Sequence, residues 1–173
     1  MIKIHGSSGI EFPNNYSIKS DSGDLTVMND VNKLWGMNST GYESKPNIPA
    51  FYVRQTAGAD AFTAASVMTW DVVVLNNGNH FSNGTTFTAP VDGLYFFSSN
   101  ILSNNATRVF HRLRVNGEGI LGTYTESYAG VSYQTVTFSV VYQLKAGDYA
   151  DAYCHGFNAY GGAYANFNGC LIG

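Results

Sequence analysis

The chain has few charged residues: Lys, Arg, Asp and Glu make up 12% of its 173 residues, against about 25% in a typical soluble domain. Much of the surface is therefore left to Asn, Ser, Thr, Gly and Tyr. Such a surface suits burial against sister chains or an assembly, and the alternative is an uncharged but ordinary monomer. The formal net charge of −3 argues against a nucleic-acid partner, which requires clustered Lys and Arg.

Cysteines and long apolar runs are also scarce. Cys154 and Cys170 are the two cysteines, too few for a disulfide framework. We expect free thiols, with a bridge between two sheets as the alternative. No apolar run approaches the roughly 20 residues of a membrane helix, and the residues after Met1 lack an apolar stretch of signal-peptide length. We expect no membrane insertion and no classical export signal.

Short alternating runs separated by turn residues fill most of the chain, which predicts an all-β sandwich or barrel. Asn83-Gly84 and Asn116-Gly117 indicate hairpins, because Asn and Gly tolerate the positive φ of such turns. The run from Thr69 to Asn76 is almost continuously apolar, which predicts a strand covered on both faces.

A boundary is expected at Lys45–Pro49, because two prolines favour extended backbone and remove hydrogen-bond donors. Residues 1–48 then form a β-rich anchoring and assembly arm, and residues 49–173 form a head domain. The strands expected in the arm are too short to bury a core alone. We expect the arm to fold only against other copies or against a larger structure.

The strand beginning at Leu94 is apolar on both of its sides. Leu94 and Phe96 share one face, and Tyr95 and Phe97 share the other. Only one face can meet the chain's own core, so the other needs an apolar surface from a neighbouring chain. A two-layer monomer with a loop over that face is the alternative. Our candidates for the contact between copies are Tyr95, Phe97 and Phe167.

Several segments occur in an order that resembles the globular head of C1q, within the tumour-necrosis-factor superfamily. The segments are Trp70-Asp71, Leu75–Phe81, Phe87–Phe97, Val115–Gly117, Leu144–Asp148 and Phe167–Ile172. The resemblance implies a C1q/TNF-like jelly-roll sandwich of about ten strands that assembles as a compact homotrimer. The positions taken as fold-motif residues are Trp70, Gly78, Phe87, Pro90, Gly93, Gly147, Asp148 and Gly169.

The chain departs from this family pattern near its closing strand. Ala150 and Asp151 stand where family members usually have an apolar β-branched residue and a tryptophan. Cys170 stands where they usually have phenylalanine. These smaller side chains imply different packing around the last strand.

The N-terminal part resembles bacteriophage proteins. The segment Ser39–Phe51 looks like the junction in phage tail-fibre and virion proteins that carry such heads, and Gly9–Pro13 is similar to phage fibre sequence. The signal peptide and the collagen stalk of animal members, with Gly at every third residue, are not seen. We therefore expect a tail fibre, head fibre or capsid decoration protein at the virion surface, with residues 1–48 binding other virion proteins. The alternative is an extracellular ligand or recognition protein of a cellular organism.

No pattern of residues indicates catalysis or a cofactor. Asp148 and Asp151 lie close in sequence, but one of them sits in a turn, and a solvated turn aspartate is a better explanation than the paired carboxylates of a glycosidase. The histidines lack the spacing of a zinc motif, and no nucleophile elbow is present. We expect a protein that is not an enzyme and that has no cofactor. No residues are predicted as metal ligands, and calcium, which some members of the resembled family bind, is left open because no acidic cluster indicates it.

Two groups of residues are candidates for contact with a receptor or partner. Arg108, Arg112 and Arg114 form a basic stripe on one face of the strand Val109–Val115. This stripe is either a solvated outer face, a subunit contact or a contact with an acidic host glycan or protein, since Arg forks match carboxylates. Tyr160 and Tyr164 lie in the Tyr-, Gly- and Asn-rich tract Tyr153–Phe167, which suits either recognition or packing at the trimer axis.

Overall fold

The structure, a computed structural model, describes residues 3–5, 9–12, 15–21, 24–30, 32–56, 65–103, 108–156, 159–160 and 164–173. The chain divides into two units, Met1–Ile48 and Pro49–Gly173, at the place where the two prolines suggested a break. Within the described ranges the regular structure is β-strand, with no α-helix. None of these residues forms a helix able to cross a membrane.

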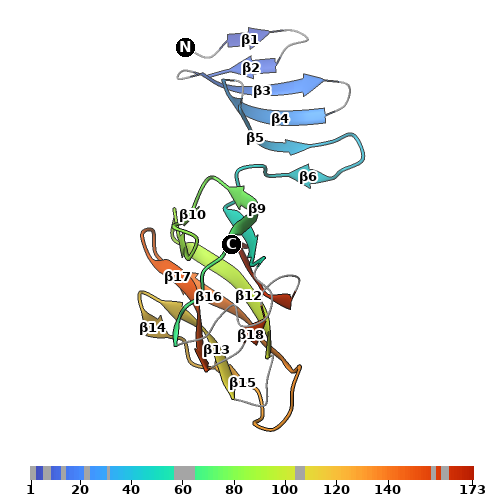
Figure 1. The fold of residues 1–173 in the computed structure, drawn as a ribbon. Coiled ribbons are helices and arrows are strands. Elements are labelled where there is room, and N and C mark those ends of the chain that lie inside the picture. The colour runs from blue at the N-terminus through green and yellow to red at the C-terminus, as the bar shows by residue number, and fades with distance from the viewer. Residues whose placement is uncertain are drawn as a thin grey trace. The chain divides into compact units, whose positions relative to one another are not determined.

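The first unit is one antiparallel sheet in which each strand pairs with the next in sequence (Figure 1). Its strands are β1 (Lys3–His5), β2 (Gly9–Glu11), β3 (Tyr16–Asp21), β4 (Asp24–Asn29), β5 (Asn32–Met37) and β6 (Glu43–Ser44). None of the hydrophobic side chains described there is fully buried. Phe12, Tyr16, Leu25 and Met37 are between 36% and 43% exposed, and Tyr42 is 75% exposed. This unit therefore lacks a hydrophobic core of its own among its described residues.

The second unit is a sandwich of two antiparallel sheets. In the β13 sheet the order is β10 (Phe81–Ser82), β11 (Thr86–Thr88), β17 (Tyr149–Gly156), β13 (Val109–Val115) and β14 (Glu118–Gly119); β15 (Thr125–Glu126) also pairs β13, and β8 (Ser66–Val67) pairs β17. In the β12 sheet the order is β16 (Thr135–Leu144), β12 (Gly93–Ser103), β19 (Asn166–Leu171), β7 (Ala50–Arg54) and β9 (Val72–Asn77); β18 (Ala159–Tyr160) also pairs β12. The predicted all-β jelly-roll sandwich is confirmed.

An aromatic cluster fills the space between the two sheets. The ring of Phe51 lies 5.0 Å from that of Phe87 and 4.8 Å from that of Phe167, measured between centroids. Tyr95, Phe97 and Phe167 belong to this cluster and are 0% exposed within one protomer. Their assignment to a contact between copies is therefore corrected, because the chain's own core already covers them. The face that remains open is the one with Leu94 and Phe96.

Strand β9 also differs from expectation. The apolar run from Thr69 to Asn76 predicts a strand covered on both faces, but β9 is at the edge of the β12 sheet. Val73, Val74 and Leu75 are 53%, 54% and 48% exposed in the protomer. The apolar run therefore forms the edge strand of the sheet, and the protomer leaves its side chains exposed.

The turns follow the residue chemistry of the sequence. Asn83-Gly84 and Asn116-Gly117 have positive φ at both positions, as the hairpin interpretation requires. Gly169 has no room for a side chain, since an added Cβ would lie 2.6 Å from Phe97 Cδ1. Trp70 and Phe87 are in the core; the other motif positions lie in turns or at strand starts: Gly78, Pro90, Gly93, Gly147 and Asp148. Both cysteines are free.

Candidate functional site

The arginine stripe lies on the outer face of the β13 sheet. Along β13 the odd-numbered residues from Val109 to Val115 are buried, so the even-numbered residues point outward. The register with β17 places Phe110 opposite His155, Arg112 opposite Tyr153 and Arg114 opposite Asp151. Directly paired residues share one face of a sheet, so each arginine meets a different neighbour.

Arg114 forms a bidentate ion pair with Asp151. Its Nε lies 2.8 Å from Oδ1, and its Nη2 lies 2.9 Å from Oδ2. Asp151 is 2% exposed, and its hydrogen bond to the guanidinium raises the pKa of Arg114. Asp151 is thus neither a solvated turn residue nor a catalytic acid. Arg114 is occupied by this internal pair, which leaves it little capacity to bind a partner.

Arg108 is also paired, but at the surface. Its Nη2 lies 2.8 Å from Oε1 of Glu126, and the hydroxyl of Tyr124 donates to Glu126 Oε2 over 3.2 Å. This exposed pair contributes little to stability. It nevertheless neutralises the Arg108 charge at the end of the stripe.

Arg112 is different, because no carboxylate pairs with it among the described residues. Its guanidinium carbon lies 5.2 Å from the centre of the Tyr153 ring, within the range of cation–π contacts. Arg114 approaches the same ring to 4.6 Å. Arg112 is half-buried, so its charge is partly removed from water without a counter-ion.

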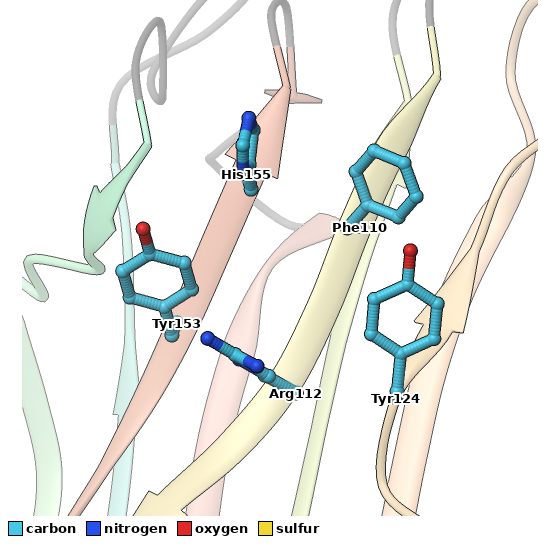
Figure 2. Close-up of a pocket in the computed structure, with 5 residues that line it drawn as sticks. All are labelled: Phe110, Arg112, Tyr124, Tyr153 and His155. Atoms are coloured by element: carbon cyan, nitrogen blue, oxygen red, sulfur yellow. The ribbon is translucent and has the colours of Figure 1, made fainter. Parts of the chain in front are cut away.

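Arg112 lies in a pocket of about 280 Å³ lined by Phe110, Arg112, Tyr124, Tyr153 and His155. Figure 2 shows these side chains around one space, with Phe110 and Arg112 from β13 and with Tyr153 and His155 from β17. The Phe110 ring lies 5.3 Å from that of Tyr124 and 5.7 Å from that of His155. The result is an aromatic pocket containing one unneutralised cation.

Of the five residues that line this pocket, the sequence predicts only Arg112 as a contact residue. Tyr153 and His155 belong to the tract Tyr153–Phe167 that the sequence suggests for recognition, but their place beside Arg112 follows only from the β13–β17 pairing. Phe110 and Tyr124 were missed. The alternation that puts Phe110 on the face of Arg112 is the one signal that was available.

The two tyrosine candidates lie with the other sheet. The backbone of Tyr160 pairs with Leu102 in β12, and the side chain of Tyr160 is outside the described residues. Tyr164 is 55% exposed, and its carbonyl accepts a hydrogen bond from Asn100. The structure therefore does not bring the Tyr164 side chain together with the arginine stripe.

The outer face of the β12 sheet has an apolar end. The even-numbered residues of β12 point to this face, and the register places Phe96 beside Val141 on β16 and Cys170 on β19. Leu94 and Val141 are 42% and 51% exposed. Leu75 lies on β9 at the edge of the same sheet, where it pairs with Tyr52 of β7, and it is 48% exposed.

The other end of the same face is polar and carries one charged side chain. Ser98 and Ser139 hydroxyls lie 3.0 Å apart, and Asn166 Nδ2 donates to Asn100 Oδ1 over 2.5 Å. Arg54, at the end of β7, is the one charged side chain that the described strands of this sheet point to this face. Such a face is suited to contact with another protein surface of low charge.

His111 is a structural residue of the core. Its Nδ1 lies 3.2 Å from the Tyr153 carbonyl oxygen, and its Nε2 lies 2.9 Å from Ser99 Oγ. Both His111 and Ser99 are 0% exposed, so no substrate reaches this Ser–His pair. Burial lowers the pKa of His111 to about 4, because a low-dielectric core disfavours the charged ring.

This buried histidine predicts loss of stability in mild acid. The unfolded chain takes up a proton below about pH 6.5, whereas the folded chain does so only near pH 4. Stability is therefore complete above about pH 6.5 and is expected to fall by about 3 kcal/mol as the pH decreases to about 4. Urea denaturation at a series of pH values measures this loss.

The His111→Gln variant is the control for this experiment. It should be less stable than the parent at pH 7 and should show a much flatter dependence between pH 6.5 and 4. Hydrogen bonds from Thr56 and Asn116 lower the pKa values of Asp71 and Asp148 from 3.8. The stability that these two carboxylates contribute is therefore lost only below about pH 4, outside the range from pH 6.5 to 4. An equally steep dependence in the variant would contradict the assignment to His111.

Within the described parts of the chain, no group of three or more His, Cys, Asp or Glu residues is placed to hold a metal ion. Asp148 accepts hydrogen bonds from Lys145 N and Asn116 Nδ2, both over 2.8 Å. This carboxylate therefore closes the turn between β16 and β17.

Comparison with known proteins identifies the sandwich. The family described as C1q domain matches residues 50–172. The globular domain of zebrafish complement 1qA protein superposes with a TM-score of 0.60 at 20% identity, over 73% of this chain and 98% of that chain. Eiger TNF from S. frugiperda superposes with a TM-score of 0.57 at 11% identity, over 73% of this chain and 94% of that chain. Murine APRIL at pH 8.5 superposes with a TM-score of 0.55 at 14% identity, over 72% of this chain and 99% of that chain. The three structures share the fold, and the family match spans most of the sequence, so the chain belongs to the C1q domain family.

Proposed function

We propose that this protein is a non-enzymatic, homotrimeric structural protein of a bacteriophage particle, as a tail fibre, head fibre or capsid decoration protein. Its jelly-roll head projects from the virion surface and binds the host surface or stabilises the particle. The observation that carries the proposal is the half-exposed apolar area around Leu94 and Val141, on a sheet face where Arg54 is the one charged side chain of the described strands. Three copies acting together give avidity without any new contact.

The outer face of the β12 sheet is the proposed contact between copies. Leu94 and Val141 leave neighbouring apolar side chains 42% and 51% exposed, and monomeric proteins generally avoid large exposed apolar patches. Burial stabilises by roughly 25 cal/mol per Å² of apolar area. Because this face has almost no charge, its burial has little desolvation cost.

The first unit is the proposed attachment arm. Its described residues form one sheet layer without fully buried hydrophobic side chains, and one layer alone does not bury enough apolar area to be independently stable. Contact with other copies or with other virion proteins supplies the missing layer. The similarity of Ser39–Phe51 and Gly9–Pro13 to phage fibre sequences supports this role.

Leu94→Asp is expected to convert trimers into folded monomers. The substitution places a charge in the apolar end of the proposed contact, where burial of an unpaired carboxylate costs several kcal/mol. In the separate protomer the same side chain faces water. Light scattering measures the molar mass, and circular dichroism checks the fold.

Leu121→Asp is the matched control, because Leu121 is 97% exposed in a turn near β14, on the other sheet. This variant should remain trimeric. A parent protein that is a stable folded monomer at micromolar concentration would contradict the proposed assembly.

The virion role has its own experiment. Antibodies against the head, applied to particles from a lysate, should decorate a tail or capsid in electron micrographs. Labelling of a cell surface or of secreted material, with unlabelled particles, would instead favour a recognition protein of a cellular organism.

A further inference from the structure

We propose that the pocket around Arg112 binds a carboxylate-bearing sugar ring, with the guanidinium pairing the carboxylate and with the aromatic side chains stacking on the ring. This inference extends the proposed function, because it names the chemical class that the head would recognise on a surface. It concerns the β13 sheet, whereas the proposed contact between copies concerns the β12 sheet.

The charge distribution points to an anionic ligand. Arg108 and Arg114 are neutralised by Glu126 and Asp151, whereas no carboxylate pairs with Arg112 in the described chain. A half-buried guanidinium without a counter-ion forms stronger ion pairs than a solvated one. Its planar fork matches a carboxylate through two parallel hydrogen bonds. The ligand therefore supplies the missing negative charge.

The walls of the pocket point to a sugar rather than to a bare anion. Four of the five lining residues are aromatic or imidazole rings: Phe110, Tyr124, Tyr153 and His155. Such rings present flat apolar surfaces with polar groups at their edges, which suits a molecule with apolar C–H faces and peripheral hydroxyls. The volume of about 280 Å³ is just below the usual range of small-ligand pockets, so one ring fits and a folded peptide does not.

The pocket remains accessible when the other sheet is covered. Phe110 and Arg112 point away from the core, because Val109, His111 and Leu113 of the same strand point into it. The outer faces of the two sheets are on opposite sides of the sandwich. Trimer formation through the β12 sheet therefore leaves this pocket in water.

Gly119 provides a way to move the guanidinium without removing its charge. A Cβ at position 119 would lie 2.7 Å from Nη1 of Arg112 and 2.9 Å from its Cζ. The long side chain of Arg112 can shift to avoid this clash, so Gly119→Ala should fold normally. The substitution would therefore change the position of the guanidinium in the pocket while keeping its charge.

The experiment is a titration of the full chain with sodium glucuronate, with N-acetylneuraminate and with glucose, followed by saturation-transfer NMR. We expect saturation transfer to at least one of the two acids and none to glucose at the same concentration. Comparison of the two acids distinguishes uronic-acid glycans from sialylated glycans as the source. Arg112→Gln and Gly119→Ala should each weaken binding about tenfold or more, because hydrogen bonds to charged groups are the strong ones.

Lys145→Gln is the matched control, since it also removes one positive charge but in the exposed turn before β17, and it should leave binding unchanged. Equal binding by Arg112→Gln would overturn the proposal, as would acetate binding as tightly as either sugar acid, or no binding of either acid. Light scattering on the same samples separates the outcomes: a trimer that binds neither acid refutes the pocket assignment alone, whereas a monomer refutes the proposed assembly.

Discussion

Phe97→Ala is expected to lower the free energy of unfolding of the protomer by about 3–5 kcal/mol. Phe97 is 0% exposed, and its ring lies 5.9 Å from that of Phe87 and 6.1 Å from that of Phe167, between centroids. Removal of the ring leaves a cavity that this rigid aromatic cluster cannot close. Urea denaturation followed by circular dichroism measures the effect.

Phe96→Ala is the matched control, because Phe96 is the adjacent residue on the opposite face of β12 and is only partly buried. It should weaken association more than it weakens the protomer. Unfolding at several protein concentrations separates these effects, since stability that comes from assembly depends on concentration. If Phe97→Ala instead dissociated the trimer and left the protomer's stability intact, then Phe97 would belong to the contact between copies.

This pair of variants shows how far the sequence allows prediction of β12. Alternation predicts correctly that residues 94 and 96 share one face and that 95 and 97 share the other, because the side-chain period of a strand is two. It does not say which face is inside, since both begin with large apolar residues. The polar Ser98 and Asn100, which continue the face of Leu94, were the available indication that this face is outside.

The arginine stripe shows a second limit. Alternation places Arg112 and Arg114 on the outer face, as the structure confirms. The sequence does not distinguish the neighbours of Arg112 from those of Arg114, because the residues opposite them belong to β17, about forty positions later in the chain. Register alone gives Arg114 a carboxylate at Asp151 and gives Arg112 an aromatic ring at Tyr153. Long-range strand pairing therefore decides which arginine is free to bind a ligand.

The ion pair of Arg114 with Asp151 leads to the second large expected effect. Arg114→Met should destabilise the protomer by about 3–5 kcal/mol, because it leaves the buried carboxylate of Asp151 without a partner. The Asp151 side chain is 3% exposed, whereas that of Arg114 is 18% exposed. Asp151→Leu should therefore cost less, since water reaches part of the remaining guanidinium. Urea denaturation at pH 7 measures each loss.

The double variant Arg114→Met with Asp151→Leu should recover most of the stability lost by Arg114→Met, because it removes both charges from the sheet and leaves apolar groups of similar size. Glu126→Ala breaks the exposed pair with Arg108 and is the control, with an expected cost of about 0–1 kcal/mol. If Arg114→Met cost no more than Glu126→Ala, water would have to reach Asp151, and the burial on which this prediction depends would be wrong. If the double variant were no better than Arg114→Met, the loss would come from packing against Tyr153, whose ring lies 4.6 Å from the Arg114 guanidinium, rather than from an unpaired charge.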